Sequence, residues 1–498
     1  METSYLKTLE LDKIIARAAE GCVCKESREK LLAIEPQCDP DEVRYALEQT
    51  DAINSLLIKN GSPRFGGVEG VSQLAARAVK GGVLSMGELL MVAGALRNFQ
   101  NLVSWYGSSE HDALPTDDLF YALAPQPGLE QQISSAILAP DAMADTASHT
   151  LNDLRKKIRA TENSIRDRLE SMVRNMDTSK YLQESVVSIR NGRYVVPVKS
   201  EYRGEVSGII HDVSSTGATV FVEPQAVVEA NARILQYRAQ EAQEIERILV
   251  AFTGQVAAIE PQFQYSYKAM LEIDVLLAKA RLALDMKAFK PTVRTDTSFS
   301  LIRARHPLID AKKCVPVDIS LGREYDSLII TGPNTGGKTV TLKTAGLLCA
   351  MAQCGFLIPA DERSEICVFD EFLVDIGDEQ SIEQNLSTFS AHMTNIVSIL
   401  NEADANSLCL FDELCSGTDP TEGAALAIAF YLRISRLLAP HIVKSRFALA
   451  ISRNTFDIMM HHYMGFFALD CFFLALNALG LGAADFSVRA FRTVANYM

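Results

Sequence analysis

A glycine-rich run with a single lysine is the segment of this chain best suited to bind a phosphate. Apolar residues 328–331 lead into it, and apolar residues at helical spacing follow it from Val340. Glycines let a loop turn its backbone N–H groups toward an anion, and the N-terminus of the next helix adds a favourable dipole. The run fits GxxxxGK[ST] between a strand and a helix, which predicts a nucleoside triphosphate site. Its members are Gly332, Pro333, Asn334, Thr335, Gly336, Gly337, Lys338 and Thr339.

Four side chains divide the expected chemistry between them. Lys338 is expected to neutralise the β and γ phosphates, and the hydroxyl of Thr339 is expected to hold Mg²⁺. A second apolar stretch, residues 407–411, ends in Asp412 and Glu413. Asp412 is placed to reach the Mg²⁺ shell, and Glu413 to orient or deprotonate an attacking water. The predicted cofactors are therefore ATP and Mg²⁺.

The chain that must position these residues is long and globular in composition. Its 498 residues are 48% hydrophobic and 22% charged, which predicts about three domains and excludes a disordered or collagenous chain. Ten cysteines include no CxxC pair, so we expect reduced thiols and no structural metal. The N-terminus mixes acidic and basic residues and lacks the pattern of a signal peptide, which predicts a cytoplasmic protein.

The net charge of −14 neither establishes nor excludes a nucleic-acid partner. Phosphate contacts are made mainly by lysine and arginine, so an acidic total argues against such a partner. The charge is unevenly distributed, however, and residues 151–252 carry 15 basic and 14 acidic side chains. A near-neutral middle section leaves room for a basic face.

Two long helices are predicted around a strand-rich insertion. Apolar residues recur at helical spacing over 151–175, and at seven-residue spacing over 227–252. Between them the period changes to two, with turn signals at Asn191-Gly192 and at 215–217. These features predict an antiparallel helical arm that carries a small β-sheet. In the alternative, the two helices are ordinary core helices of an α+β domain.

Five segments together resemble the MutS family of ATPases. The resemblance is to its second branch, which suppresses recombination and lacks a mismatch-reading domain. It covers residues 1 to about 430. The segments are GPNTGGKT at 332–339, ARHPLI at 304–309, STFSAHM at 387–393, FDELCSGTDPTEGAALA at 411–427 and the strand-rich 190–224.

This resemblance implies a fold, a mode of assembly and partners. The fold class is α plus α/β, with a helical core, the helical arm and an ABC-type P-loop ATPase domain. A homodimer is expected, in which Ser387 contacts the partner's γ-phosphate and Asp419 couples the two sites. The implied targets are branched DNA, bound without sequence specificity, or stalled or collided ribosomes with their RNA, or both. The implied function is an ATP-hydrolysing clamp that suppresses homologous recombination.

The sequence departs from the family pattern in two places. Cys415 stands where the family has glycine, beside the predicted catalytic carboxylates. After residue 433 the family continues into a strand ending in Thr-Thr-His-Tyr, whose histidine senses the γ-phosphate, and we find no such strand. Residues 434–498 have an unusual apolar texture, which we interpret as the product of a disrupted reading frame. The competing interpretation is a membrane segment at 464–484, although no membrane partner is expected.

The resulting domain organisation has five parts, and the function has an alternative. The parts are a helical core at 1–150, the arm at 151–253 with its β insertion at 185–223, a helical return at 254–295, an incomplete ATPase domain at 296–433 and the tail at 434–498. The family's C-terminal nuclease domain is not found, so endonuclease activity is not expected. In the alternative, the chain binds ATP, hydrolyses it poorly and serves as a binding module. An SMC-like motor is disfavoured, since the predicted arm is only about 25 residues per side.

Overall fold

The computed structural model describes residues 3–332, 337–377, 385–412 and 446–452. The chain divides into two compact units. Unit 1 comprises Met1–Pro63, Trp105–Tyr121 and Met270–Met498, and unit 2 comprises Arg64–Ser104 and Ala122–Ala269. Each unit is described by itself below.

One long helix of unit 1 begins where capping chemistry predicts. At α4 (Pro40–Asn60), the Asp39 side chain accepts hydrogen bonds from Asp41 N at 2.7 Å and Glu42 N at 3.2 Å, and Pro40 takes the first helical position. The Asp39-Pro40 pair is thus a local signal for the start of this helix. The other helices near the chain start are α1 (Thr3–Thr8), α2 (Leu11–Ala19), α3 (Lys25–Leu32) and α7 (Asp117–Tyr121), and α12 (Glu260–Met286) ends in this unit.

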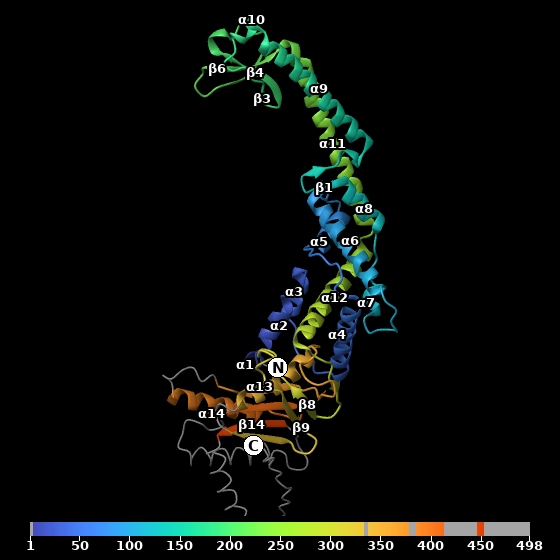
Figure 1. The fold of residues 1–498 in the computed structure, drawn as a ribbon, viewed down its shortest axis with the longest axis vertical. Helices are drawn as coiled ribbons and strands as arrows, with labels where there is room; N and C mark the ends of the chain where they lie inside the picture. Colours follow the sequence, from blue (N-terminus) through green and yellow to red (C-terminus); the bar gives the residue numbers. More distant parts are fainter. Residues whose placement is uncertain (1–2, 333–336, 378–384, 413–445, 453–498) are drawn as a thin grey trace, which may run out of the picture. The chain divides into compact units, whose positions relative to one another are not determined.

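Unit 1 contains a four-stranded parallel sheet (Figure 1). Its order is β10 (Ser327–Gly332), β14 (Arg446–Ser452), β13 (Ser407–Asp412) and β12 (Glu371–Asp375). Every residue of β13 is buried, as expected for a parallel strand covered on both faces. The apolar stretches 328–331 and 407–411 of the sequence analysis both form strands of this sheet. Helix α13 (Lys338–Gln353) packs against β13, and α14 (Asn385–Glu402) packs against β12.

Strand β14 corrects the sequence analysis, which found no strand after residue 433. It pairs in parallel with β10 on one side and β13 on the other. The apolar run at 447–451 has the composition of a buried parallel strand, but it does not end in the Thr-Thr-His-Tyr for which the sequence was searched. A search for one motif therefore missed a strand that backbone pairing identifies. The rest of the segment 434–498, including 464–484, lies outside the described residues.

A close approach fixes α13 against β13. A Cβ added at Gly346 would lie 2.6 Å from Leu410 Cδ1 and 2.9 Å from Leu9 Cδ2. The absence of a side chain at 346 therefore lets the helix approach the sheet closely. A second sheet in unit 1 has the order β7 (Thr292–Val293), β11 (Glu365–Ile366), β8 (Phe299–Ala304) and β9 (Val317–Leu321).

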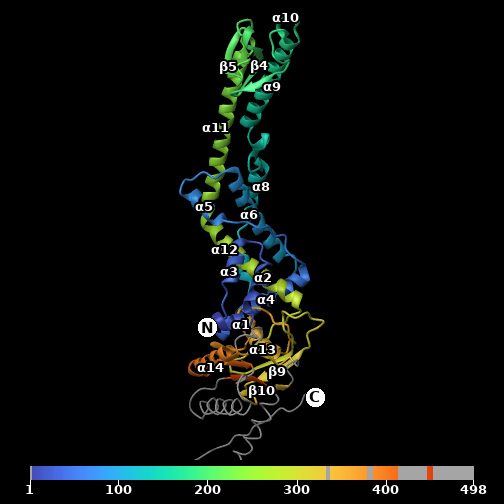
Figure 2. The same ribbon diagram turned by 90° about the vertical axis from the view of Figure 1, so that its left-hand side faces the viewer.

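In unit 2, α9 (His149–Arg174) and α11 (Val228–Ala258) pack side by side in opposite directions (Figure 2). Arg155 Nε donates to Glu241 Oε1 at 2.6 Å, and Arg238 Nη2 donates to Glu162 Oε1 at 2.9 Å. The two long helices predicted from the sequence are confirmed, although α11 ends at Ala258, six residues beyond the predicted end. The unit also contains α5 (Val71–Val79), most of α6 (Met86–Tyr106), α8 (Pro127–Ala136), α10 (Met176–Ser179) and the hairpin of β1 (Ile137–Ala139) and β2 (Ala142–Met143).

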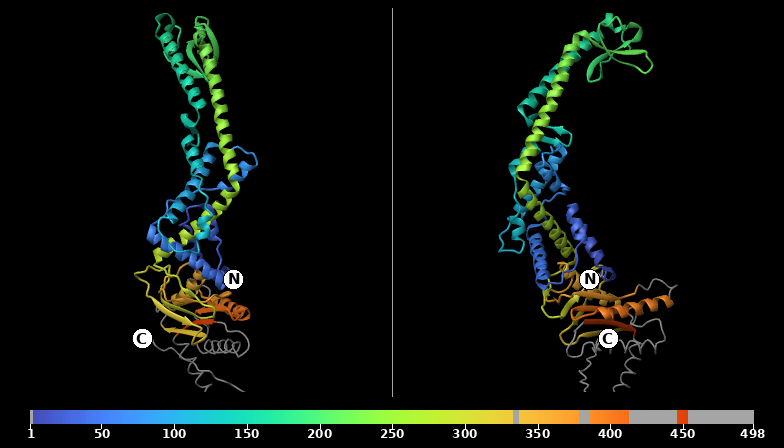
Figure 3. Two further views of the ribbon diagram at one scale, coloured as in Figure 1. Left: turned by 90° about the vertical axis from the view of Figure 1, so that its right-hand side faces the viewer. Right: turned by 180° about the vertical axis from the view of Figure 1, so that it is seen from behind.

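A small antiparallel sheet lies between α9 and α11 in the sequence and at one end of the pair (Figure 3). Its order is β3 (Ser188–Arg190), β4 (Arg193–Lys199), β6 (Thr219–Pro224) and β5 (Gly208–Val213). Asn191 and Gly192 have φ of 49° and 75°, as a tight hairpin between β3 and β4 requires. Gly217 has φ of 70° in the turn before β6. Both predicted turns are confirmed.

Among the helices that the structure describes, none combines the length and hydropathy needed to cross a bilayer.

Candidate functional site

The residue immediately before α13 is a glycine, and its backbone has a conformation that glycine adopts readily. Gly337 is the N-cap residue, with φ 77° and ψ 18°, a left-handed conformation that favours glycine. Lys338 follows as the first helical residue and its side chain is buried. Pro333, Asn334, Thr335 and Gly336 lie outside the described residues.

Thr339 and Asp412 meet although 73 residues separate them. The Thr339 hydroxyl donates a hydrogen bond to Asp412 Oδ2. Asp412 is only 8% exposed, and its buried Oδ1 has no hydrogen-bond partner among the residues that the structure describes. A buried carboxylate oxygen without a donor is costly, unless a cation or another donor reaches it. A hydroxyl and a carboxylate are the oxygen ligands that Mg²⁺ prefers in proteins, so the pair fits that ion.

The strand register brings several chain segments to one edge of the parallel sheet. Gly332 pairs with Ser452, and Asp412 pairs with Ala450 of the same strand, β14. All four strands run in the same direction, so their carboxyl ends lie together. In open parallel sheets, ligands bind beyond the carboxyl ends of the strands. The first turn of α13 and Asp412 therefore share an edge suited to a ligand.

The remaining predicted site residues are not all placed. Glu413, Cys415 and Asp419 lie outside the described residues. Ser387 lies within α14, in the stretch of that helix whose side chains are not described. The roles given to these residues stay predictions.

The sequence analysis missed a polar cluster at the carboxyl end of β12. His392 Nδ1 lies 3.1 Å from both carboxylate oxygens of the buried Asp375. Asn395 Nδ2 donates to Asp375 Oδ1 at 2.8 Å, and Tyr5 Oη donates to Asn395 Oδ1 at 3.2 Å. The cluster ties α14 and α1 to the end of β12. An apolar run ending in aspartate was the available signal, since the same pattern identified Asp412.

His306 of the ARHPLI segment has a buried position beside the junction of α1 and α2. Its Nε2 lies 3.9 Å from Glu10 Oε2. Burial lowers the pKa of His306, which favours the neutral imidazole near pH 7. The pKa of Glu10 is also lowered, first of all by its hydrogen bond from Lys13. His306 is therefore a buried residue that packs beside Glu10.

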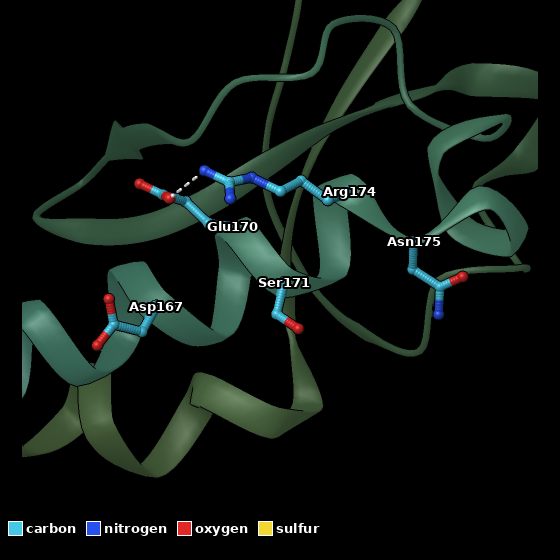
Figure 4. A pocket seen from close by; sticks show the side chains of 5 residues that line it. All are labelled: Asp167, Glu170, Ser171, Arg174 and Asn175. Atoms are coloured by element: carbon cyan, nitrogen blue, oxygen red, sulfur yellow. Dashed lines mark hydrogen bonds and ion pairs between the residues drawn. The ribbon is translucent and has the colours of Figure 1, made fainter.

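A hollow on unit 2 contains none of the predicted site residues (Figure 4). It has a volume of about 420 Å³ and lies beside the end of α9. Within it, Arg174 and Glu170 form an ion pair at 3.0 Å. The lining residues are Asp167, Glu170, Ser171, Arg174 and Asn175.

Comparison with known proteins gives one family. Residues 328–452 match the MutS family's domain V. The chain is 45% identical to the endonuclease MutS2 of Agathobacter rectalis over 437 residues, which are 87% of this chain and 55% of that protein. The chain belongs to the MutS2 family. The chain also matches the endonuclease MutS2 of Geobacillus thermodenitrificans, with 47% identity over 86% of this chain and 55% of that protein. It matches the endonuclease MutS2 of Clostridioides difficile with 41% identity over 90% of this chain and 57% of that protein.

Three facts follow from these matches. The resemblance inferred from five short segments is confirmed at the level of the MutS2 family. The domain V match ends at Ser452, the last residue of β14, so it includes the strand that the sequence analysis missed. The chain spans about half the length of the curated MutS2 relatives it matches.

Proposed function

We propose that this chain is an ATP-hydrolysing nucleic-acid clamp of the MutS type, which acts as a homodimer in the cytoplasm. The observation that carries the proposal is the contact between Thr339 and Asp412 at the first turn of α13. The buried Oδ1 of Asp412, for which the described part of the chain offers no hydrogen-bond donor, favours a cation at that point. In this proposal the ATPase domain begins near residue 296, and the domain ranges expected from the sequence are retained.

The chain's own residues divide the work at this site. The amides at the start of α13 and Lys338 bind the phosphates, while Thr339 and Asp412 hold Mg²⁺. Bound Mg²⁺ supplies charge neutralisation at the phosphates. Glu413 orients the attacking water and accepts its proton. Ser387 and Asp419 act across the dimer, at the partner's nucleotide and between the two sites.

The nucleic-acid part of the proposal rests on a basic and aromatic patch on unit 2, which we call the tip patch. It consists of Lys180, Tyr181, Lys199 and Tyr202. Lys180 Nζ lies 4.9 Å from the Tyr181 ring centroid, and the Tyr181 and Tyr202 centroids are 5.3 Å apart. Lys199 Nζ donates to the backbone O of Lys180 at 3.3 Å, which places the Lys199 ammonium group beside the Lys180 backbone. Ammonium groups beside aromatic rings suit a phosphate backbone and stacked bases.

In this proposal α9 and α11 are the clamp arm, and the tip patch contacts backbone and shape in place of base sequence. The expected targets are branched DNA, where binding would suppress recombination, or stalled or collided ribosomes, or both. Endonuclease activity is not part of the proposed function of this chain.

The nucleotide site is tested by Lys338→Ala and Asp412→Asn in the full chain. Binding of a fluorescent ATP analogue with Mg²⁺ is expected to be lost in Lys338→Ala, and Asp412→Asn is expected to remove its Mg²⁺ dependence. Tight, Mg²⁺-dependent binding by both variants would refute the site. Fluorescence anisotropy with branched DNA, linear duplex and isolated ribosomes, with and without ATP, then distinguishes the targets.

One observation favours the alternative, a clamp that binds ATP and hydrolyses it poorly. Strand β14 occupies the place between β10 and β13 but carries no histidine. In this alternative the γ-phosphate is bound without the family's sensor. Steady-state ATPase turnover separates the two functions: turnover equal to that of Glu413→Gln supports the alternative, and clearly higher turnover supports the clamp that hydrolyses ATP.

A further inference from the structure

Lys279 is a buried lysine that contacts the carboxyl end of α13, the helix that begins at the predicted phosphate loop. It belongs to α12 and is 5% exposed. Its Nζ donates a hydrogen bond to Cys354 O at 2.7 Å and lies 5.1 Å from the Phe356 ring centroid. Among the described residues, no carboxylate forms an ion pair with it. A buried charge without a counter-charge destabilises a fold, so its presence calls for a physical reason.

The hydrogen-bond partner of Lys279 explains the position. Cys354 is the C-cap residue of α13, and the last carbonyls of a helix have no partner within the helix. These carbonyls carry the negative end of the helix dipole, which a cation stabilises. Lys279 therefore supplies a donor and a positive charge where α13 lacks both.

Other polar groups fix the same helix end. Gln353 is fully buried, and its Nε2 donates to Gln37 O at 2.9 Å and to Phe369 O at 2.8 Å. Thr50 Oγ1 donates to Gly355 O at 2.8 Å. These uncharged groups already hold the end of α13 in place, so a charge is not required for anchoring alone.

We propose that Lys279 is a positioning residue for the predicted phosphate loop: it caps α13 at Cys354, and its positive charge acts along the helix to favour a bound triphosphate. This inference rests on the proposed nucleotide site. Sixteen residues of α13 separate the two ends, a distance of about 24 Å. At an effective dielectric of about 20, two net negative charges at that distance change the affinity by a factor of about ten at most.

This coupling makes nucleotide affinity depend on the proton of Lys279. Burial lowers the pKa of Lys279 to about 8. The titratable groups that face it are Cys354, next to α13, and Lys30 on α3. Because linkage is reciprocal, a charge that favours the triphosphate is itself favoured by the triphosphate. Affinity for ATP is therefore expected to fall as the pH rises through 8.

The test uses the full chain with mant-ATP and Mg²⁺ at pH 7.0 and pH 9.5. Lys279→Gln keeps a donor for Cys354 O but carries no charge, and Lys279→Met removes both. Lys290→Met, at a lysine 39% exposed, is the matched control for removal of a charge. Thermal unfolding of each variant reports whether it folds, and Lys279→Gln carries the test if Lys279→Met does not fold.

Between pH 7.0 and pH 9.5 the affinity for mant-ATP is expected to fall in the wild type and in Lys290→Met. This fall is expected to be several-fold larger than the fall in Lys279→Gln. At pH 7.0, Lys279→Gln is expected to bind several-fold more weakly than the wild type. An unchanged pH dependence in Lys279→Gln, with Lys338→Ala unable to bind, overturns this inference and leaves the nucleotide site standing. Absence of wild-type binding refutes both.

Discussion

A buried carboxylate holds the small sheet of unit 2 to α11, and its removal is expected to open that sheet. Glu223 of β6 is fully buried. Arg193 Nη1 lies 2.9 Å from each of its oxygens, Asn231 Nδ2 donates to Oε1 at 2.9 Å, and His211 Nε2 contacts Oε2. Three strands and one helix thus meet at a single carboxylate.

The expected cost of Glu223→Leu follows from these partners. Removal of one member of a buried ion pair costs roughly 3–5 kcal/mol, because the other charge is left without a partner. Arg193 is 24% exposed and can turn toward water, so the lower end applies, about 3 kcal/mol. Asn231 is fully buried but keeps its hydrogen bond to Tyr194 O, so it adds little. A loss of about 3 kcal/mol corresponds to roughly a hundredfold more open sheet.

Hydrogen–deuterium exchange with mass spectrometry measures this opening locally, in the full chain. Peptides that cover β4 and β6 are expected to exchange about a hundredfold faster in Glu223→Leu. Glu229→Leu is the matched control, since this carboxylate on α11 is 90% exposed. Equal protection of β4 and β6 in Glu223→Leu and Glu229→Leu would show that the buried pair does not hold the sheet.

Three further outcomes are expected. The pKa of Lys279 is about 8 in the folded chain, against an ordinary value of 10.5. Between pH 8 and pH 10.5 the unfolded chain therefore binds more protons than the folded chain. The free energy of unfolding is expected to rise by roughly 3 kcal/mol over this pH range. Urea unfolding at pH 7.5 and 10 is expected to show less of this gain in Lys279→Gln. Gly346→Ala is expected to cost about 1–3 kcal/mol by overpacking against Leu410, with partial rescue by Leu410→Ala in thermal unfolding. The double variant Lys180→Gln/Lys199→Gln is expected to weaken branched-DNA binding and to reduce the slope of log affinity against log salt by about 2, measured by anisotropy.

Sequence patterns located those features whose signals are local. The start of α4 follows from Asp39-Pro40, and the hairpin from Asn191-Gly192, because each turn or cap depends on residues next to one another. The meeting of Thr339 with Asp412 was expected for a different reason. A phosphate loop and an acidic strand end share the carboxyl edge of a parallel sheet, whatever the sequence distance between them.

Features built from distant segments left no such signal. Lys279 lies in a helix that reads as a mixture of apolar and charged residues, and its partner carbonyl is 75 residues away. A buried lysine has the same letter as an exposed one, so only packing distinguishes them. Strand β14 was missed for the opposite reason, since the search was for a motif at its end and the strand itself is an ordinary apolar run.

Buried polar groups lie at both ends of α13, and this placement bears on how the site works. Thr339 and Asp412 meet at the amino end, while Lys279, Gln353 and Thr50 fix the carboxyl end. Between them the helix is buried along most of its length. A helix held at both ends and packed closely between them cannot slide alone, because interiors are dense and yield little. Free energy released when a phosphate binds at the amino end is therefore expected to act on the groups that hold the carboxyl end, so a charge placed there can affect binding.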